Sequence, residues 1–400
     1  MKYIVIVPDG MADDPVDELG GKTPLEAART TNMDYLAQHG STGLVQTIPD
    51  QMKPGSDIGN MALLGYDPKK YHTGRAPLEA ANLGLTLDDD EVAFRCNLVT
   101  VVDDKMSDYS AGHMGTKEAS LLIDELNGKI KLDGVKFYTG KGYRHILILK
   151  VRDPRVFCAI KTTPPHDILR KNIDPYLPRG PEANMLLKLM ERSIEIFDAH
   201  TVNQVRVDLG ENPANMIWLW GQGTRPKLPS FNEKFNVKGS IISAVDLVNG
   251  IGRLAGLEVI DVPGATGYYD TNYLGKAEYA LESLKKKDFV YIHIEAPDEA
   301  GHNGDIKAKI SAIEKIDQDI VGTILNRYGE HDNVRILVLP DHPTPVKLRT
   351  HTSDPVGFVM YGKGIAHDGS TEYSETESEK NGLKFESGEQ LLGHFMTKYL

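Results

Sequence analysis

Three apolar segments of the 400-residue chain each run into an aspartate. The first, MKYIVIVPDG, is apolar at successive positions and stops just before Asp9. A second, DFVYIHIEAPDEAGH, is followed by Asp298 and His302, and a third, VRILVLPDHP, by Asp341 and His342. Strands that are apolar throughout are typical of parallel sheets buried on both faces. Because open α/β sheets bind ligands at the carboxyl ends of their strands, we expect these side chains to meet at one edge.

Carboxylates and histidines at one sheet edge point to metal binding. Each residue has a simpler explanation, since an Asp near a Pro often caps a helix and a His in a loop is often a surface residue. Together, however, they provide the oxygen and imidazole ligands of Mn²⁺, Zn²⁺ or Mg²⁺ sites. With the nearby His351, the candidate ligands are Asp9, Asp298, His302, Asp341, His342 and His351. This number suits two ions, and two ions can stabilise both the attacking and the leaving oxygen of a phosphoryl transfer.

Adjacent Asp341 and His342 would point to opposite faces if they lay within a strand. Pro340 and Pro343 indicate that the strand has already ended there, which would allow both side chains to converge.

Ser56 is the candidate nucleophile. It follows Pro54-Gly55 and opens a predicted helix over residues 57–64, which Gly65 ends. The N–H groups and dipole of that helix would favour an alkoxide and then a phosphoserine. The alternative is that Ser56 only caps the helix.

Composition excludes several classes of protein. A net charge of −12 without a Lys/Arg stripe argues against a nucleic-acid surface. No segment is apolar enough to span a membrane, and the chain shows no signal peptide, so we expect a cytoplasmic protein. Cys96 and Cys158 lie far apart, which suggests neither a disulfide framework nor a cysteine zinc site.

The order of elements predicts one α/β domain interrupted by a second domain. Thr23 to Glu26 has the spacing of a capping box and should open a helix. Short apolar strands are predicted at 240–243, 258–262, 289–294, 334–339 and 356–361. We expect residues 1–74 and 223–400 to form a domain with a mostly parallel sheet, and residues 75–222 to form an α+β module.

Inside the α+β module, helices are predicted near 117–126 and 182–197, and a strand turns at Asp103-Asp104. In the larger domain, the polar stretch 368–381 is interpreted as a surface loop.

The motifs together resemble a known family. The segments are PDGMAD, KPGSDIGNMALLGYDP, GRAPLEAA, APDEAGHNGD, LPDHPTP and RTHTSDPV. They resemble the alkaline-phosphatase superfamily and, within it, the archaeal-type phosphoglycerate mutases that need no 2,3-bisphosphoglycerate. The resemblance implies an alkaline-phosphatase-like core and a substrate-binding lid formed by residues 75–222.

The resemblance also implies a ligand set and a reaction. One ion would be held by Asp9, Ser56, Asp341 and His342, and the other by Asp298, His302 and His351. Ser56 would be phosphorylated transiently while 3-phosphoglycerate and 2-phosphoglycerate interconvert. We expect two divalent ions, Mn²⁺ first, with Zn²⁺, Co²⁺ and Mg²⁺ as alternatives, and no bisphosphoglycerate cofactor.

Three further residues are candidate contacts to the small phosphorylated substrate. His113 lies in KMSDYSAGHMG, which resembles a loop where the family supplies a substrate-contacting histidine. Arg144 could bind a carboxylate or phosphate, because its planar guanidinium suits both, and Lys276 could neutralise phosphate near the metals. The alternative for Arg144 and Lys276 is that they are merely solvated.

Other functions stay open at this point. The stretch GGKTPLEAARTTNMDYLA also resembles related sequences proposed to be homoserine kinases, although no nucleotide-binding glycine motif is present. A metal-dependent phosphatase would use the same groups if water reached the phosphoserine. A purely structural metal site would need no nucleophile. The sequence does not predict the oligomeric state.

Overall fold

The computed structural model describes residues 1–329 and 333–397, which form two compact units. Unit 1 comprises Met1–His72 and Lys227–Leu400, and unit 2 comprises Thr73–Pro226. The boundaries expected from the sequence fall after residues 74 and 222, close to these positions. None of the helices in the described part of the chain is both long and apolar enough to cross a membrane.

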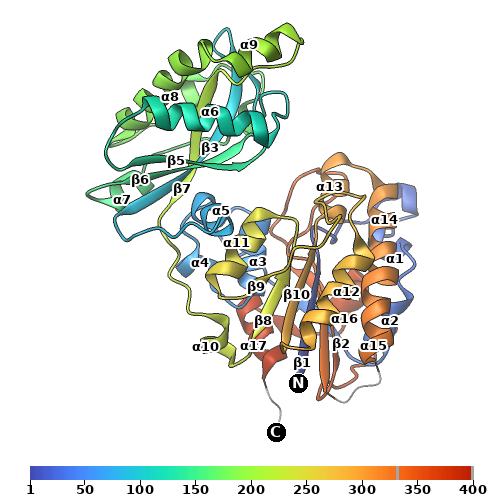
Figure 1. Ribbon diagram of the computed structural model, residues 1–400. Helices are drawn as coiled ribbons and strands as arrows, with labels where there is room; N and C mark the ends of the chain where they lie inside the picture. The colour runs from blue at the N-terminus through green and yellow to red at the C-terminus, as the bar shows by residue number, and fades with distance from the viewer. Residues whose placement is uncertain (330–332, 398–400) are drawn as a thin grey trace. The chain divides into compact units, whose positions relative to one another are not determined.

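Unit 1 is built on an eight-stranded sheet (Figure 1). In spatial order its strands are β13 (Lys384–Phe385), β2 (Ser41–Val45), β12 (Val356–Gly362), β11 (Val334–Val338), β1 (Lys2–Pro8), β10 (Phe289–Ile294), β8 (Gly239–Ile242) and β9 (Glu258–Val259). Every described pairing is parallel except the two made by β12. The expected α/β fold with a mostly parallel sheet is therefore confirmed.

The central strands are in register at their carboxyl ends. β1 lies between β10 and β11, and Ile6 is paired with Ile292 on one side and Val338 on the other. The strands are buried along nearly their whole length, because helices cover both faces. Side chains that directly follow β1, β10 and β11 therefore start from the same edge of the sheet.

Alternating residues of each strand face different helices. One face packs against α2 (Thr31–Gln38), α12 (Tyr273–Leu284), α14 (Ile306–Lys315), the π-helical turn η4 (Ile316–Val321) and α15 (Gly322–Tyr328). The other face packs against α3 (Ser56–Leu63) and α11 (Asp246–Leu254), and α17 (Gly388–Met396) packs on α3. Short helices complete the unit: η1 (Asp17–Leu19), α1 (Pro24–Ala27), α4 (Pro68–Tyr71), α10 (Phe231–Phe235), α13 (Ala296–Asn303) and α16 (Glu375–Lys380).

Unit 2 has a five-stranded antiparallel sheet. Its strands are β3 (Glu91–Val102), β4 (Lys105–Asp108), β5 (Val135–Lys141), β6 (Arg144–Lys150) and β7 (Met216–Gly223). Its helices are α5 (Arg75–Asn82), α6 (Thr116–Lys129), α7 (Pro154–Cys158), η2 (Pro165–Ile168), η3 (Asp174–Tyr176), α8 (Ala183–Asp198) and α9 (Thr201–Asp208). The helices predicted near 117–126 and 182–197 are confirmed as α6 and α8.

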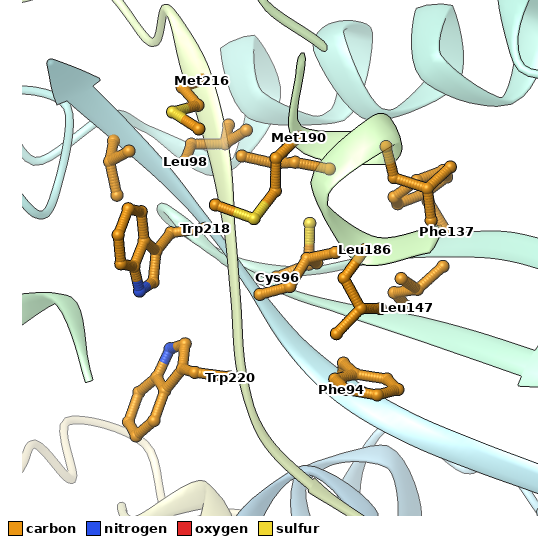
Figure 2. Packing of buried hydrophobic residues seen from close by; sticks show 14 of the residues in the cluster. Phe94, Cys96, Leu98, Phe137, Leu147, Leu186, Met190, Met216, Trp218 and Trp220 are labelled. Atoms are coloured by element: carbon orange, nitrogen blue, oxygen red, sulfur yellow. The ribbon is translucent and has the colours of Figure 1, made fainter. Parts of the chain in front are cut away.

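The core of unit 2 lies between its sheet and helix α8. Phe94 and Cys96 of β3 point toward Leu186 and Met190, as Figure 2 shows. Cys96 is a free, fully buried thiol and acts as a small apolar core residue. The predicted turn at Asp103-Asp104 joins β3 to β4, and both residues have positive φ angles, as this tight turn requires.

Side-chain capping at two helix starts in unit 1 confirms one prediction and contradicts another. Thr23 and Glu26 form the predicted capping box at the start of α1. The interpretation of 368–381 as one surface loop is wrong, because α16 begins inside it. Ser374 accepts a hydrogen bond from the Glu377 N–H at 3.1 Å and so starts that helix.

Glu375, at the start of α16, makes the stability of the fold pH-dependent. Its carboxylate accepts a hydrogen bond from the Thr23 hydroxyl at 2.7 Å, and desolvation by burial raises its pKa to about 7 from an ordinary value of 4.5. Between these values the folded protein keeps a proton that the unfolded chain has lost. The free energy of unfolding therefore falls as the pH rises through this window and levels off above it.

We expect Glu375→Gln to raise the melting temperature at about pH 8 and to change it little at about pH 4.5, because a neutral amide needs no proton. Differential scanning calorimetry at the two pH values measures this. Glu379→Gln, an exposed position on the same helix, is the matched control and should shift neither value. Equal shifts at both pH values would show that Glu375 is already ionised in the fold.

Candidate active site

The strand-end residues of unit 1 come together. Asp9 follows β1 directly, and Asp298 and His302 lie one turn apart on α13, which begins beyond β10. Their i and i+4 positions put both side chains on one face of that helix. β11 ends at Val338, so Asp341 lies outside the strand.

The first group forms around Ser56. Its Oγ lies 3.3 Å from Asp9 Oδ2 and 3.3 Å from His342 Nε2. His342 Nε2 also lies 3.4 Å from Asp9 Oδ1 and 3.6 Å from Asp341 Oδ2. Because the strand has ended before Asp341, two sequence neighbours point into the same site.

The second group consists of Asp298, His302 and His351. Asp298 Oδ2 lies 3.3 Å from His302 Nε2, and Asp298 Oδ1 lies 3.4 Å from His351 Nε2. The two histidine Nε2 atoms are 2.8 Å apart. The ring of His342 lies 4.1 Å from that of His351, so the two groups are adjacent.

The hydroxyl of Ser56 does not cap a helix. Helix α3 begins at Ser56 itself, and its N-cap residue is Gly55, which makes no side-chain capping hydrogen bond. The capping interpretation of Ser56 is therefore wrong. The hydroxyl is directed at a carboxylate and an imidazole, as a nucleophile requires.

Histidine geometry favours metal binding through Nε2. His302 Nδ1 lies 3.1 Å from the Arg349 carbonyl and His351 Nδ1 lies 3.4 Å from the Pro54 carbonyl. Since a carbonyl only accepts, each Nδ1 carries the hydrogen and a neutral ring keeps its lone pair on Nε2. The pKa of His302 is raised to about 9, mainly by its hydrogen bond with Asp298. The site therefore favours a positive charge at His302, which in the metal-free chain is a proton and which a bound cation would replace.

His342 has the same orientation for a different reason. The Thr344 hydroxyl donates to Asp298 Oδ1 at 2.5 Å, so its oxygen can accept from His342 Nδ1 at 3.3 Å. The lone pair of His342 therefore lies on Nε2, facing Ser56 and Asp9.

The buried carboxylates of this site also favour the binding of a cation. Burial raises the pKa of Asp9 well above its usual value, and the nearby charges of Asp341 and Asp298 raise it further. Within the described chain, Asp9 Oδ1 is buried and has no hydrogen-bond partner. Uncompensated buried acceptors beside imidazole lone pairs fit divalent cations.

Similarity to known proteins decides the family. The chain is 51% identical over 383 residues to the 2,3-bisphosphoglycerate-independent phosphoglycerate mutase of Methanosarcina acetivorans, which covers 96% of each chain. The chain belongs to this family of phosphoglycerate mutases. The resemblance drawn from the motifs is confirmed.

Further comparisons support membership of this phosphoglycerate mutase family. A probable member from Geobacter sulfurreducens is 47% identical over 397 residues, with 98% of each chain covered. The family model described as 2,3-bisphosphoglycerate-independent phosphoglycerate mutase matches residues 37–203. Among solved structures, the cofactor-independent phosphoglycerate mutase of Thermoplasma acidophilum has a TM-score of 0.68 at 30% identity and covers 99% of both chains. A protein of Pyrococcus horikoshii has a TM-score of 0.84 at 30% identity, covering 100% of this chain and 98% of its own.

The predicted substrate contacts of this family member lie in both units. Lys276 is fully buried on α12 of unit 1, where its Nζ donates to the His293 carbonyl at 2.7 Å and burial lowers its pKa to about 8. In unit 2, His113 has a φ of +52° and its ring lies 6.4 Å from that of Tyr143. The Arg144 guanidinium lies 5.8 Å from the same ring. The substrate roles of Lys276, His113 and Arg144 stay predictions.

The sequence patterns did not predict Asn60, which links the candidate nucleophile Ser56 to the candidate ligand Asp341. Its Nδ2 donates to Asp341 Oδ2 at 2.6 Å and to the Ser56 carbonyl at 2.8 Å. The buried Tyr291 hydroxyl donates to Asn60 Oδ1 at 2.6 Å, so the amide has one orientation. The position of Asn60 one turn after Ser56 in the predicted helix could have suggested it.

We expect Asn60→Ala to lower the affinity for Mn²⁺ by about 10- to 100-fold, with a fall in kcat, because Asp341 loses its orienting donor. Tyr291→Phe is the matched variant, since it leaves both Asn60 donors in place, and its effect should be smaller. Isothermal titration calorimetry and turnover assays measure both quantities. An affinity and a kcat like those of the unsubstituted protein would contradict the role of Asn60.

Proposed function

We propose that this chain is a metal-dependent phosphoglycerate mutase that interconverts 3-phosphoglycerate and 2-phosphoglycerate without 2,3-bisphosphoglycerate. Family membership supports the reaction, and the environment of Ser56 supports the mechanism. The observation that carries the mechanism is that Ser56 Oγ caps no helix and faces Asp9 and His342, each at 3.3 Å.

Two ions would be held by the two groups already described. We assign Asp9, Ser56, Asp341 and His342 to one ion, and Asp298, His302 and His351 to the other. Mn²⁺ is our first choice, because carboxylate and imidazole ligands together suit it. When bound, such ions lower the pKa of a coordinated hydroxyl and neutralise charge on a transferring phosphoryl group.

Ser56 performs the transfer in two steps. Its Oγ attacks the phosphorus of 3-phosphoglycerate, the bond from phosphorus to O3 breaks, and the hydroxyl proton ends on the glycerate O3. The C2 hydroxyl of the retained glycerate then attacks the phosphoserine, and Ser56 Oγ recovers a proton as 2-phosphoglycerate leaves. Asp9 Oδ2, 3.3 Å from Ser56 Oγ, is placed to accept the proton in the first step. Water must be excluded between the steps, since it would release phosphate instead.

A coupled assay tests the proposal. Purified protein with Mn²⁺ and 3-phosphoglycerate, but without bisphosphoglycerate or nucleotide, should form 2-phosphoglycerate, followed with enolase. A parallel assay for inorganic phosphate should stay near background. Dominant phosphate release would identify a phosphatase. An inactive but folded, metal-loaded protein would overturn the substrate assignment, and homoserine with several phosphate donors would then be tested.

A further inference from the structure

His293 is a buried histidine in the metal region that belongs to neither candidate ligand group. It lies in β10, five positions before Asp298, and is fully buried. Like Tyr291, two residues earlier, it projects toward the face that carries α3. Its Nε2 lies 3.1 Å from Asp9 Oδ2.

The imidazole and the carboxylate are both incompletely satisfied. Within the described chain, neither His293 Nε2 nor Asp9 Oδ1 has a hydrogen-bond partner of good geometry. Ligand atoms of Asp9, His293 and Asp341 lie within 4.8 Å of one another. Distance alone would permit His293 either to bind a cation or to donate a hydrogen bond to Asp9.

The contact with Ser243 favours the second of these roles. Its Oγ accepts the Val245 N–H at 3.0 Å, and its second contact is His293 Nδ1 at 3.2 Å. The hydroxyl hydrogen needs an acceptor, and a neutral imidazole nitrogen provides one. With Nδ1 accepting, the ring hydrogen must lie on Nε2, the atom that faces Asp9.

This tautomer is opposite to that of the three candidate histidine ligands. His302 and His351 direct Nδ1 at carbonyl oxygens, and His342 directs it at Thr344, so their Nε2 lone pairs are available. His293 instead presents an N–H, which cannot ligate a metal through Nε2.

We propose that His293 is a positioning residue whose Nε2–H, set by Ser243, holds the Asp9 carboxylate in the orientation needed at the metal site. His293 is therefore not a ligand itself. Its backbone is anchored as well, because Lys276 Nζ donates to the His293 carbonyl at 2.7 Å. The inference rests on the metal assignment of Asp9 in the proposed function, but the protonation of His293 can be measured independently of turnover.

Long-range ¹H–¹⁵N spectra of the full chain labelled with [¹⁵N]histidine test the tautomer. Spectra are recorded metal-free and with Zn²⁺, and the resonances of His293 are identified by their loss in His293→Gln. We expect Nε2 to be protonated in both states. A deprotonated Nε2, or one whose resonance shifts as a zinc ligand does, would overturn the proposal.

His145 in unit 2 is an internal reference for those spectra. It is also buried, and its Nδ1 accepts the Gly140 N–H at 3.0 Å, so it must carry its hydrogen on Nε2. Its resonances should show the Nε2–H form and stay unchanged when Zn²⁺ is added.

Metal titrations test the consequence for Asp9. Ser243→Ala should weaken Mn²⁺ binding, and His293→Leu should weaken it by about 10- to 100-fold without removing an ion from the stoichiometry. His293→Gln, which keeps an N–H donor near the position of Nε2, should recover part of the affinity. Loss of one bound ion in His293→Leu would mean that His293 is a ligand. Unchanged affinity in all three folded variants would mean that Asp9 does not depend on it.

Discussion

Replacement of Ser56 by alanine should lower kcat by about 10⁶-fold, the scale seen when a covalent nucleophile is removed. The fold should persist, because the Ser56 hydroxyl caps no helix and its hydrogen-bond partners in the described part of the chain are Asp9 and His342. We expect the free energy of unfolding to change by no more than about 0.5 kcal/mol. Coupled turnover assays and chemical denaturation measure the two quantities.

Ser230 provides the matched control for Ser56. It is a genuine N-cap, accepting the Glu233 N–H at 3.2 Å, so Ser230→Ala should cost about 1 kcal/mol of stability and leave kcat unchanged. Acid quenching of the unsubstituted enzyme during turnover, followed by mass spectrometry, should reveal phosphate on Ser56. Turnover retained by Ser56→Ala would exclude a phosphoserine at this position.

Removal of divalent metal should lower the stability of the protein, and this is the second large effect that we expect. Without cations, the carboxylates of Asp9, Asp298 and Asp341 lie buried in one region. An ion present at about 100 times its Kd should add about 2.7 kcal/mol to the free energy of unfolding. For a unit of this size, that is a rise in melting temperature of roughly 5–10 °C per ion.

Calorimetry with a chelator and with increasing Mn²⁺ measures this stabilisation. Asp298→Asn, which removes the carboxylate of the second group, should lose about half of the total metal-induced shift or more and keep the rest. The same melting temperature with chelator and with saturating Mn²⁺ would contradict metal binding at these groups.

Much of the fold followed from local patterns. Uninterrupted apolar strands predicted a parallel sheet, and the capping box at Thr23 predicted the start of α1, because both depend on residues close in sequence. The interpretation of 368–381 as a loop was wrong because it was based on polar composition. That composition does not reveal that Ser374 caps the start of a helix. A short helix made of polar residues lacks a hydrophobic period, so hydrophobic periodicity does not reveal it.

The role of Ser56 cannot be decided from the local sequence pattern. A serine at a helix start has the same sequence context whether it caps the helix or attacks a substrate. The two roles separate only when the direction of the hydroxyl is known, and here it points to Asp9 and His342.

The sequence by itself determined the parallel sheet and the residues gathered at its edge, including Asp9, Asp298 and Asp341. It could do so because the carboxyl ends of parallel strands must lie together, wherever they occur in the chain. Only the tertiary structure decided what supports those residues. Asn60 and Tyr291 are 231 residues apart, and Ser243 and His293 are 50 apart. The proton position of a buried histidine depends on the neighbour that packing brings to its other nitrogen, and no local sequence pattern specifies that neighbour.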